Sequence, residues 1–404
     1  MEGRIKWVLG CLATKLAPRK KDRFVFTSFA GHYSDNPRYI SEAMRRLAPE
    51  VDIVWLVTPE RMKDLPDDVR GVPIGTLRAG WVRGTAAALV DNVYGDRTTW
   101  IYDGQVGIKQ RVTSFLQRKK GQPLYTTFHG TPLKHIGCDQ IGSRVTGMIC
   151  PEATLMPGNE FSLKILEHVT FGRMRMLLTG SPRNDLLFCG EEEREALRAK
   201  LGLPEGRRIL LYAPTFRGDG ADYATVNLRR SGPEQLETMD PERLCGALTE
   251  RFGGEWTLVC RLHYHAEKAI DWQALEEKYP GRYINGNTSD DMAEWLACAD
   301  ALITDASSCM FDFMLTGRPC LLYFPDFVYY GNQERGFYMD PETLPFPLSM
   351  KFEDLLSQIA TFDAEAYRTG VEKLLQTLGN ADRGDAAEKI AALILKEQGI
   401  RVKE

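Results

Sequence analysis

The sequence predicts an α/β protein built from two Rossmann-like, doubly wound domains. Short apolar runs alternate with helical runs in both halves of the chain, as they do in parallel sheets covered by helices on both faces. The 404 residues suffice for two domains, at roughly 150 residues per domain. Polar residues follow several of the predicted strands, and the carboxyl ends of strands are where open parallel sheets bind their ligands.

The first half of the chain alternates between predicted strands and helices. The strands are expected at residues 23–30, 51–57, 124–128 and 175–178, and the helices at residues 38–47 and 81–90. The turn-rich segment GHYSDNP at 31–37 separates the first strand from the first helix. An acid-rich helix at 191–200 and the segment GLP at 202–204 end this half.

The second half restarts the same rhythm and ends in helices. Strands are expected at residues 208–213, 256–260, 283–285, 301–304 and 320–324, and helices at residues 309–315, 352–359, 364–377 and 386–395. These elements predict five parts: an N-terminal segment 1–22, a first Rossmann-like domain 23–188, a linker helix and loop 189–206, a second Rossmann-like domain 207–378, and a C-terminal helix 379–404.

Composition excludes several classes of protein. Charged and apolar fractions of 26% and 43% are ordinary for a globular protein and unlike those of disordered, collagen-like or coiled-coil chains. The net charge of −4 gives no basic field for nucleic acid, so no nucleic-acid partner is expected. Nine cysteines without a CxxC pair predict reduced thiols and a cytoplasmic location. No apolar run approaches the roughly 20 residues of a membrane span, and no signal peptide is predicted.

Basic residues gather near the N-terminus and again at 111–120. The first cluster consists of Arg4, Lys6, Lys15, Arg19, Lys20, Lys21 and Arg23, and the second of Arg111, Arg118, Lys119 and Lys120. The first is interleaved with apolar residues, a pattern typical of a basic amphipathic helix lying on an anionic membrane. A solvated helix packed on the first domain is the equally weighted alternative.

The segment YTTFHGTPLKHIG at 125–137 is the first candidate for chemistry. A predicted strand stops at His129, and Gly130 and Pro132 prevent its continuation, so an imidazole stands on a loop directly after a strand. Such a histidine is well placed for proton transfer. Taken alone, His129 is equally well explained as an ordinary loop histidine.

Five predicted strand ends carry polar residues of related chemistry. They are His129 with Thr131 and Lys134, Arg183, Thr215 with Arg217, Arg261 with His263, and Ser307 with Ser308 and Asp312. Two domains whose strand ends face one another would bring these residues into one interdomain cleft. Guanidinium groups and the N-terminus of a helix starting at Cys309 match phosphate oxygens, so the cleft is predicted to bind a diphosphate.

Several segments together resemble the CDP-glycerol glycerophosphotransferase family, which contains teichoic acid primases and polymerases. They are YSDNPRYI, FHGTPLKHIG, GSPRNDLL, YAPTFR, RLH and TDASSCMFDFMLTGRPCLLYFPDFVYYGNQERGFYMD, which occur in this order between Tyr33 and Asp385. Phe128 stands where the family usually has Trp. The resemblance implies a GT-B-like fold with an acceptor-side first domain and a CDP-glycerol-binding second domain.

The resemblance also implies roles for individual residues. His129 would be the general base and His263 a second essential histidine near the donor phosphates. The CDP-glycerol site would be lined by Phe128, Gly130, Thr131, Pro132, Arg183, Pro214, Thr215, Arg261, Leu262, Ser307, Ser308 and Asp312. An imidazole suits this chemistry because its pKa of about 6.5 lets it accept the proton of an acceptor hydroxyl near neutral pH.

The implied reaction transfers glycerol phosphate from CDP-glycerol to a hydroxyl of a lipid-linked or polymeric acceptor and releases CMP. The implied location is the inner face of the cell membrane. No acidic pair at metal-ligand spacing stands out, so no tightly bound metal is expected, and Mg²⁺ in loose association stays open. The alternatives are transfer of ribitol phosphate from CDP-ribitol, a nucleotide-sugar glycosyltransferase of the same fold, and a non-catalytic binding protein.

Overall fold

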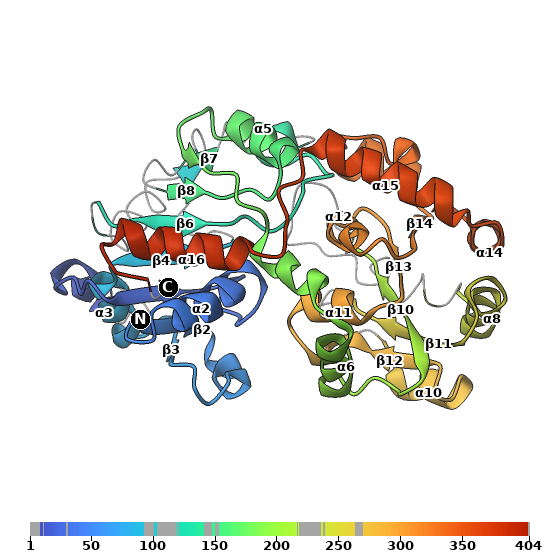
Figure 1. The fold of residues 1–404 in the computed structure, drawn as a ribbon, viewed down its shortest axis with the longest axis horizontal. Helices are drawn as coiled ribbons and strands as arrows, with labels where there is room; N and C mark the ends of the chain where they lie inside the picture. Colours follow the sequence, from blue (N-terminus) through green and yellow to red (C-terminus); the bar gives the residue numbers. More distant parts are fainter. Residues whose placement is uncertain are drawn as a thin grey trace. The chain divides into compact units, whose positions relative to one another are not determined.

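The computed structural model divides into two compact units, drawn in Figure 1. It describes residues 9–402 apart from 11, 30, 93–100, 103–118, 120, 141–147, 150–152, 216, 218–235, 237–238 and 263–269. The first unit contains Met1–Thr131, Arg144–Asp185 and Gly379–Glu404, and the second contains Pro132–Ser143 and Leu186–Leu378. The predicted cleft between two facing domains stays a prediction.

The first unit is built on a seven-stranded parallel sheet with the strand order β3-β2-β1-β4-β6-β8-β9. Its strands are β1 (Arg23–Phe26), β2 (Asp52–Val57), β3 (Gly71–Pro73), β4 (Ala88–Asp91), β6 (Leu124–Thr126), β8 (Ala153–Leu155) and β9 (Arg175–Met176). A separate antiparallel pair is formed by β5 (Ile101–Tyr102) and β7 (Met148–Ile149). The order 3-2-1-4 reverses between β1 and β4, as in Rossmann folds, which confirms the predicted fold class.

The helix predicted at 81–90 is wrong. Helix α3 (Leu77–Thr85) covers only its first part, and Ala88–Asp91 forms the central strand β4 between β1 and β6. All four residues of β4 are buried, so the strand lacks the alternation of polar and apolar residues that distinguishes a half-exposed strand from a helix.

Helices cover the first sheet. Helix α2 (Asp35–Leu47) packs against β1 and β4, and α16 (Ala386–Glu397) packs on α2, as Figure 1 shows. Helix α5 (Glu160–Val169) follows β8. The carboxylate of Asp185 accepts hydrogen bonds from Ala386 N at 3.0 Å and Ala387 N at 2.7 Å. The C-terminal helix, predicted as a separate part, therefore belongs to the first unit and is capped by a residue 201 positions earlier.

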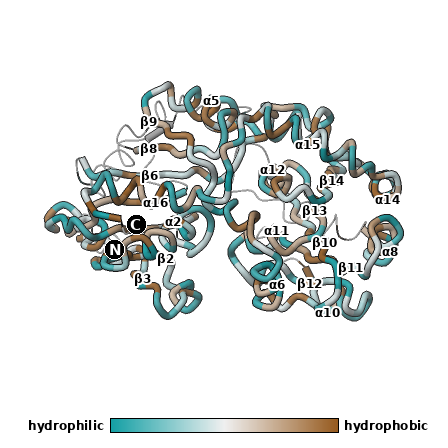
Figure 2. The backbone as a smooth tube through the Cα atoms, in the orientation of Figure 1, coloured by the Kyte–Doolittle hydropathy of each residue, from teal (hydrophilic) through white to brown (hydrophobic). Residues whose placement is uncertain are grey.

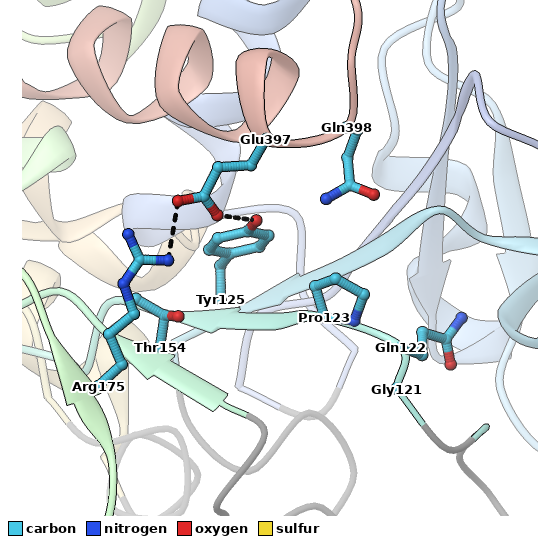
Figure 3. A pocket seen from close by; sticks show the side chains of 8 residues that line it. All are labelled: Gly121, Gln122, Pro123, Tyr125, Thr154, Arg175, Glu397 and Gln398. Atoms are coloured by element: carbon cyan, nitrogen blue, oxygen red, sulfur yellow. Dashed lines mark hydrogen bonds and ion pairs between the residues drawn. The ribbon is translucent and has the colours of Figure 1, made fainter.

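A shallow pocket of about 480 Å³ lies in the first unit beside the end of α16 (Figure 3). It is lined by Gly121, Gln122, Pro123, Tyr125, Thr154, Arg175, Glu397 and Gln398. Glu397 accepts a hydrogen bond from Tyr125 Oη at 2.5 Å and pairs with Arg175 at 2.8 Å. Gln122 donates to the carbonyl oxygens of Arg83 and Ala86. Tyr125 and Arg175 thus hold α16 on the sheet, whereas Gln122 binds the end of α3.

The second unit is built on a six-stranded parallel sheet with the order β12-β11-β10-β13-β14-β15. Its strands are β10 (Arg207–Ala213), β11 (Glu255–Cys260), β12 (Tyr283–Asn285), β13 (Ala301–Thr304), β14 (Cys320–Tyr323) and β15 (Leu348–Ser349). The order again follows the Rossmann pattern, with its reversal between β10 and β13. The five strands predicted for this half are confirmed, and β15 is an addition.

Helices cover both faces of the second sheet. They are α6 (Glu191–Lys200), α8 (Pro241–Phe252), α10 (Trp272–Lys278), α11 (Met292–Cys298), α12 (Cys309–Phe313), α13 (Phe327–Tyr329), α14 (Phe352–Ala360) and α15 (Ala364–Leu378). Buried apolar side chains of the strands pack against α8 and α14 in one core, and the strands of this sheet are strongly hydrophobic in Figure 2. Within the described ranges, no helix is both long and apolar enough to cross a bilayer.

Candidate active site

His129 stands just past the carboxyl end of β6 in the first unit. The strand ends at Thr126, Thr127 N still donates to Asp91 O at 3.0 Å, and Phe128 then adopts a φ of 58°. This left-handed backbone is uncommon for a bulky residue and turns the chain away from the sheet. The half-buried imidazole contacts the ring of Phe128, with 4.2 Å between centroids, and meets Phe29 edge-on at 6.3 Å.

A buried arginine fixes the backbone around His129. Arg183 Nη1 donates to Asp35 Oδ2 at 2.6 Å and to His129 O at 3.2 Å. Asn36 Oδ1 accepts from Arg183 N at 3.0 Å, and Asn36 Nδ2 donates to Phe128 O at 3.2 Å. The start of α2 at 35–36, the loop after β6 at 128–129 and the 3₁₀ turn that contains Arg183 are therefore tied together in the first unit.

The rest of this loop is also held in place. Gly130 has a φ of 123°, a conformation that L side chains rarely adopt. Thr131 is buried, and its hydroxyl accepts from Asn159 Nδ2 at 2.7 Å. Asn159 in turn caps α5 by accepting from Ser162 N at 2.8 Å. The structure thus brings Phe128, His129, Gly130, Thr131 and Arg183 together.

Arg217 organises the strand ends of the second unit. Its side chain is 0% exposed and makes two hydrogen bonds to Asp326, at 2.9 and 2.8 Å, and an ion pair with Asp305 at 2.9 Å. It also donates to Thr215 O and Thr215 Oγ1 at 2.8 and 2.9 Å. Burial alone would lower the pKa of Arg217, but the two carboxylates outweigh it and raise this pKa. One guanidinium therefore joins the loops after β10, β13 and β14.

Thr215 and Pro214 lie at the carboxyl end of β10. Thr215 N and Oγ1 both donate to Asp305 Oδ1, at 2.8 and 2.9 Å, so the hydroxyl is engaged within the protein. Pro214 is buried, whereas Thr215 is half-buried. Their predicted part in the CDP-glycerol site stays a prediction.

Ser307 and Ser308 lie half-buried at the start of α12, and Asp312 lies buried within it. The helix has only five residues before it tightens into a 3₁₀ turn at Met314–Thr316. Ser307 Oγ accepts from Cys309 N at 3.4 Å, whereas the Ser308 side chain makes no capping bond. The short length of this helix weakens its dipole as a seat for phosphate, and the hydroxyls of Ser307 and Ser308 add two donors there.

Arg261 and Leu262 follow β11. The Arg261 guanidinium donates to the carbonyl oxygens of Gly286 at 2.7 Å, Asp290 at 2.8 Å and Ser289. Its burial lowers the pKa of Arg261. The side chain of Asn287 binds the backbone of Leu262 twice: Oδ1 accepts from Leu262 N at 3.0 Å, and Nδ2 donates to Leu262 O at 2.6 Å. Arg261 thus holds the 286–290 loop, and its predicted contact with phosphate stays a prediction, as does the role of His263, which lies outside the described residues.

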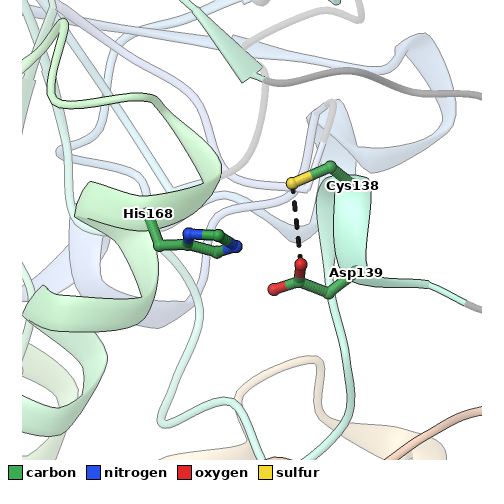
Figure 4. Close-up of side chains that lie close together, drawn as sticks. All are labelled: Cys138, Asp139 and His168. Atoms are coloured by element: carbon green, nitrogen blue, oxygen red, sulfur yellow. Dashed lines mark hydrogen bonds between the residues drawn. The ribbon is translucent and has the colours of Figure 1, made fainter.

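The segment 132–139 belongs to the second unit, although it continues the His129 loop. Tyr338 Oη donates to Asp139 Oδ2 at 2.7 Å and accepts from Ile136 N at 3.2 Å, and its ring meets that of His135 at 4.6 Å. Figure 4 shows the additional contact between Cys138 Sγ and Asp139 Oδ1, at 3.7 Å. Hydrogen bonds and a ring contact therefore hold this segment against residues 336–338.

Comparison with known proteins supports the resemblance seen in the sequence. The family model described as CDP-Glycerol:Poly(glycerophosphate) glycerophosphotransferase matches residues 12–396. The chain belongs to this family. The predicted family is thereby confirmed.

Relatives of this glycerophosphotransferase family member come from teichoic acid synthesis. It is 29% identical over 400 residues to a teichoic acid poly(glycerol phosphate) polymerase of Bacillus subtilis (strain 168), covering 94% of this chain and 50% of that protein. It is 28% identical over 399 residues to a teichoic acid glycerol-phosphate transferase of Staphylococcus aureus (strain NCTC 8325 / PS 47), covering 93% of each. The chain therefore spans about half the length of the first relative and nearly all of the second.

A solved structure gives the same comparison in three dimensions. A histidine variant of the wall teichoic acid polymerase TagF, soaked with CDPG, aligns with a TM-score of 0.76 at 25% identity. The alignment covers 98% of this chain and 94% of that chain.

Sequence reasoning missed several residues of these two sites. Asp35, Asn36, Asn287, Asp326 and Tyr338 were not singled out, although all but Asn287 lie in segments that carry the family resemblance. Each acts through a partner far away in the sequence, and a single sequence shows no such pairing. The positive φ of 58° at Asp35 is visible only in the structure.

Proposed function

We propose that this chain transfers glycerol phosphate from CDP-glycerol to a hydroxyl of a lipid-linked or polymeric acceptor, releasing CMP, in the synthesis of teichoic acid or a related cell-surface polymer. The observation that carries the proposal is the position of His129, an imidazole on a strained loop at a strand end, in a chain of the CDP-glycerol family. The names of its relatives support the donor and the product.

In the proposed mechanism His129 accepts the proton of the acceptor hydroxyl as its oxygen attacks the β-phosphorus of CDP-glycerol. The new P–O bond forms as the bond to the CMP oxygen breaks, and CMP leaves with the electron pair. Charge grows on the phosphoryl oxygens, where cationic groups and hydroxyls such as those of Ser307 and Ser308 stabilise it. His263 is the proposed second histidine near the donor phosphates.

CMP release from CDP-glycerol tests the function directly. We expect release that depends on a lipid-linked or polymeric acceptor and is faster than release from CDP-ribitol or nucleotide release from UDP-sugars. His129→Ala should lower turnover by about 10²-fold or more, because general base catalysis contributes that much. Lys164→Ala, which removes an exposed side chain from α5, is the control. Wild-type turnover in the His129 variant would discard the general-base assignment.

The proposed reaction uses no tightly bound metal, with Mg²⁺ at most in loose association with the donor. Dialysis against EDTA should then leave the fold unchanged, and any lost turnover should return at once on adding Mg²⁺. A requirement for slow metal reconstitution would contradict this part of the proposal.

We also propose that the protein is cytoplasmic and docks on the inner face of the cell membrane through a patch of the first unit. This N-terminal apolar patch consists of exposed Leu9, Leu12, Leu16, Leu77 and Trp81. Thr14 Oγ1 donates to Gly80 O at 2.8 Å, which ties the N-terminal helical residues to α3. Arg19, Lys20 and Lys21 are exposed directly after them. Apolar side chains beside lysine and arginine favour binding to anionic bilayers.

Not every basic residue of the predicted N-terminal cluster contributes to this surface. Arg23 is buried and pairs with Asp52 at 2.6 Å. Of the residues at 111–120 only Lys119 is described, and burial and the charge of Arg19 lower its pKa. Arg19 and Lys119 therefore lie close enough for their charges to repel each other.

Flotation on anionic liposomes tests the membrane proposal. Replacing Leu12 and Leu16 by Ser should reduce the bound fraction, as should deletion of residues 1–21, whereas Leu178→Ser, an exposed leucine elsewhere in the first unit, should not. Equal binding by all variants would rule out this patch.

A further inference from the structure

Lys134 occupies a fixed position in the second unit. Its backbone pairs with that of Phe337 in an antiparallel bridge. On either side, His135 N donates to Gly336 O and Tyr338 N donates to Leu133 O, both at 2.8 Å. Because its neighbours on both sides are bonded, the backbone of Lys134 cannot turn, and its side chain leaves the chain from a defined point.

That point lies beside the strand-end turn of β13. Phe337, the bridge partner of Lys134, packs against a cluster of Ala306, Phe324 and Tyr330. Ala306 immediately precedes Ser307. Among the described residues, the charged and titratable groups that act most strongly on the Lys134 ammonium are Arg335, Asp305, Arg217 and Cys309. The ammonium therefore stands among the loops that follow β10, β13 and β14.

The charges around Lys134 are unbalanced. Asp305, the carboxylate that acts on Lys134, is paired with Arg217 at 2.9 Å. The Lys134 ammonium has no hydrogen-bond or ion-pair partner among the residues that the structure describes, and the side chain is half-buried. Burial and the charge of Arg335 lower the pKa of Lys134 to about 8. A half-buried cation among other cations is stabilised when an anion arrives.

We propose that Lys134 binds a nonbridging oxygen of the donor diphosphate, as an anion-binding residue of the second unit. This inference rests on the proposed function for the identity of the donor, and on the chain's own residues for the anion site. The ammonium offers three donors and a compact positive charge, which suits a phosphate oxygen. It would offset charge that builds up on the phosphates as CMP leaves.

Calorimetric titration of the full chain tests the proposal, with CDP-glycerol and inorganic diphosphate as separate probes. Lys134→Met should weaken the binding of each probe by about 10- to 100-fold, the effect of losing one charge-assisted hydrogen bond to an anion. Lys373→Met removes an exposed lysine from α15 of the same unit and should leave both affinities within about twofold of wild type. Equal affinities in the Lys134 and Lys373 variants would overturn the proposal.

The pH dependence of binding separates a direct contact from a structural role. In the free protein Lys134 loses its proton as the pH rises through about 8, whereas a bound phosphate holds that proton and raises the pKa. Affinity should therefore be full below pH 8 and fall above it, by up to about tenfold per pH unit. Lys134→Met should lack this alkaline fall, and Lys134→Arg should keep affinity at high pH.

The contributions of other titrating groups to the pH dependence of binding cancel when wild type is compared with Lys134→Met. Arg335, Arg217, Asp305, Cys309, His135 and Tyr338 remain in every Lys134 variant, so the difference between wild type and Lys134→Met isolates Lys134. An alkaline fall of the same size in Lys134→Met would overturn the direct contact. Unchanged circular dichroism and thermal unfolding would show that the variant is folded; if it is not, Lys134→Arg alone supplies the test, because it retains charge and an alkyl stem.

The two probes also separate this inference from the proposed function. If wild type binds CDP-glycerol and diphosphate while Lys134→Met binds neither well, both proposals are supported. If wild type fails to bind CDP-glycerol but binds diphosphate through Lys134, the donor is wrong and the anion site stands. If wild type binds CDP-glycerol and Lys134→Met binds it equally, the function stands and the role of Lys134 is wrong. If wild type binds neither probe, both proposals fail.

Discussion

Each unit ties its strand-end loops together with one buried arginine, but the two arginines are balanced differently. In the first unit Arg183 donates to the carboxylate of Asp35 and to the carbonyl oxygen of His129. In the second unit Arg217 lies between two carboxylates, Asp305 and Asp326. Both sites are at the reversal of a Rossmann-like sheet or beside it, so similar scaffolds support different electrostatics.

The difference suggests a division of labour. The first unit uses its arginine to hold a strained backbone, with a φ of 58° at both Asp35 and Phe128, around one imidazole. The second unit uses its arginine to absorb negative charge, which leaves Lys134 available for an anion. A proton acceptor needs a fixed loop, whereas a diphosphate site needs carboxylates that are already neutralised.

The largest effect is expected when Arg217 is removed. Arg217→Met leaves two carboxylates facing each other in a buried site, which should cost about 3–5 kcal/mol of stability in the second unit. Hydrogen exchange should quicken in β10 and β13 and stay unchanged in β1 and β2. Arg243→Met, which removes an exposed pair with Glu353, is the control and should leave exchange in both sheets unaltered. If hydrogen exchange in β10 and β13 stays slow in the Arg217 variant, Arg217 is not required to stabilise the two buried carboxylates.

A smaller effect is expected at the matching position of the first unit. Asp35→Asn keeps a residue that tolerates the left-handed backbone but removes the charge opposite Arg183, at a cost of about 2–3 kcal/mol. Turnover should fall more than donor affinity, because the 128–129 loop that holds the proposed base loosens while the second unit, with Lys134, is untouched. Asp67→Asn, an exposed aspartate, is the control. Loss of donor affinity instead would break the proposed division of labour.

Sequence predicted the strands better than it predicted the site. The strands at 283–285 and 301–304 were placed at their observed bounds, because their apolar runs end at clear turn residues. Central β4 was missed because a fully buried strand carries no alternation of polar and apolar residues. Short strands such as β3, β8 and β15 depend on their neighbours in the sheet, which a single sequence does not show.

The sequence predicts which types of residue form the site, but it does not predict which residues bind one another. A histidine, arginines and serines after strands were recognisable because parallel sheets place strand ends at one edge. Arg183 and Asp35 are 148 positions apart, and Arg217 and Asp326 are 109 apart. The direction of an arginine, inward to carbonyls as for Arg261 or toward a ligand, is a tertiary property that residue type does not predict.

The segment that carries Lys134 can be disturbed at Gly336. A Cβ at this position would overlap Nδ1 of His135, so Gly336→Ala should displace the 132–139 segment from residues 336–338 at a cost of about 1–2 kcal/mol. Donor affinity should weaken more than turnover, the reverse of Asp35→Asn. Gly190→Ala, where the new methyl group meets open space, is the control. If the two glycine variants behave identically, the 132–139 segment has no part in the donor site.

The smallest effect is expected far from both strand-end sites, at the seam between α16 and the first sheet. Glu397→Gln removes the charge that pairs with exposed Arg175 but keeps an acceptor for the Tyr125 hydroxyl, so stability should fall by only about 1 kcal/mol. Burial and then Glu397 raise the pKa of Tyr125, so the stability gained from the protonated phenol is present below pH 10 and is lost as the pH rises further. Denaturant unfolding of both proteins between pH 7 and 11 checks this.

Turnover and donor affinity of the Glu397 variant should be those of wild type, because the contact between α16 and the first sheet does not involve Arg183 or Arg217. A change in turnover or in donor affinity would show that the first unit transmits strain from α16 to His129.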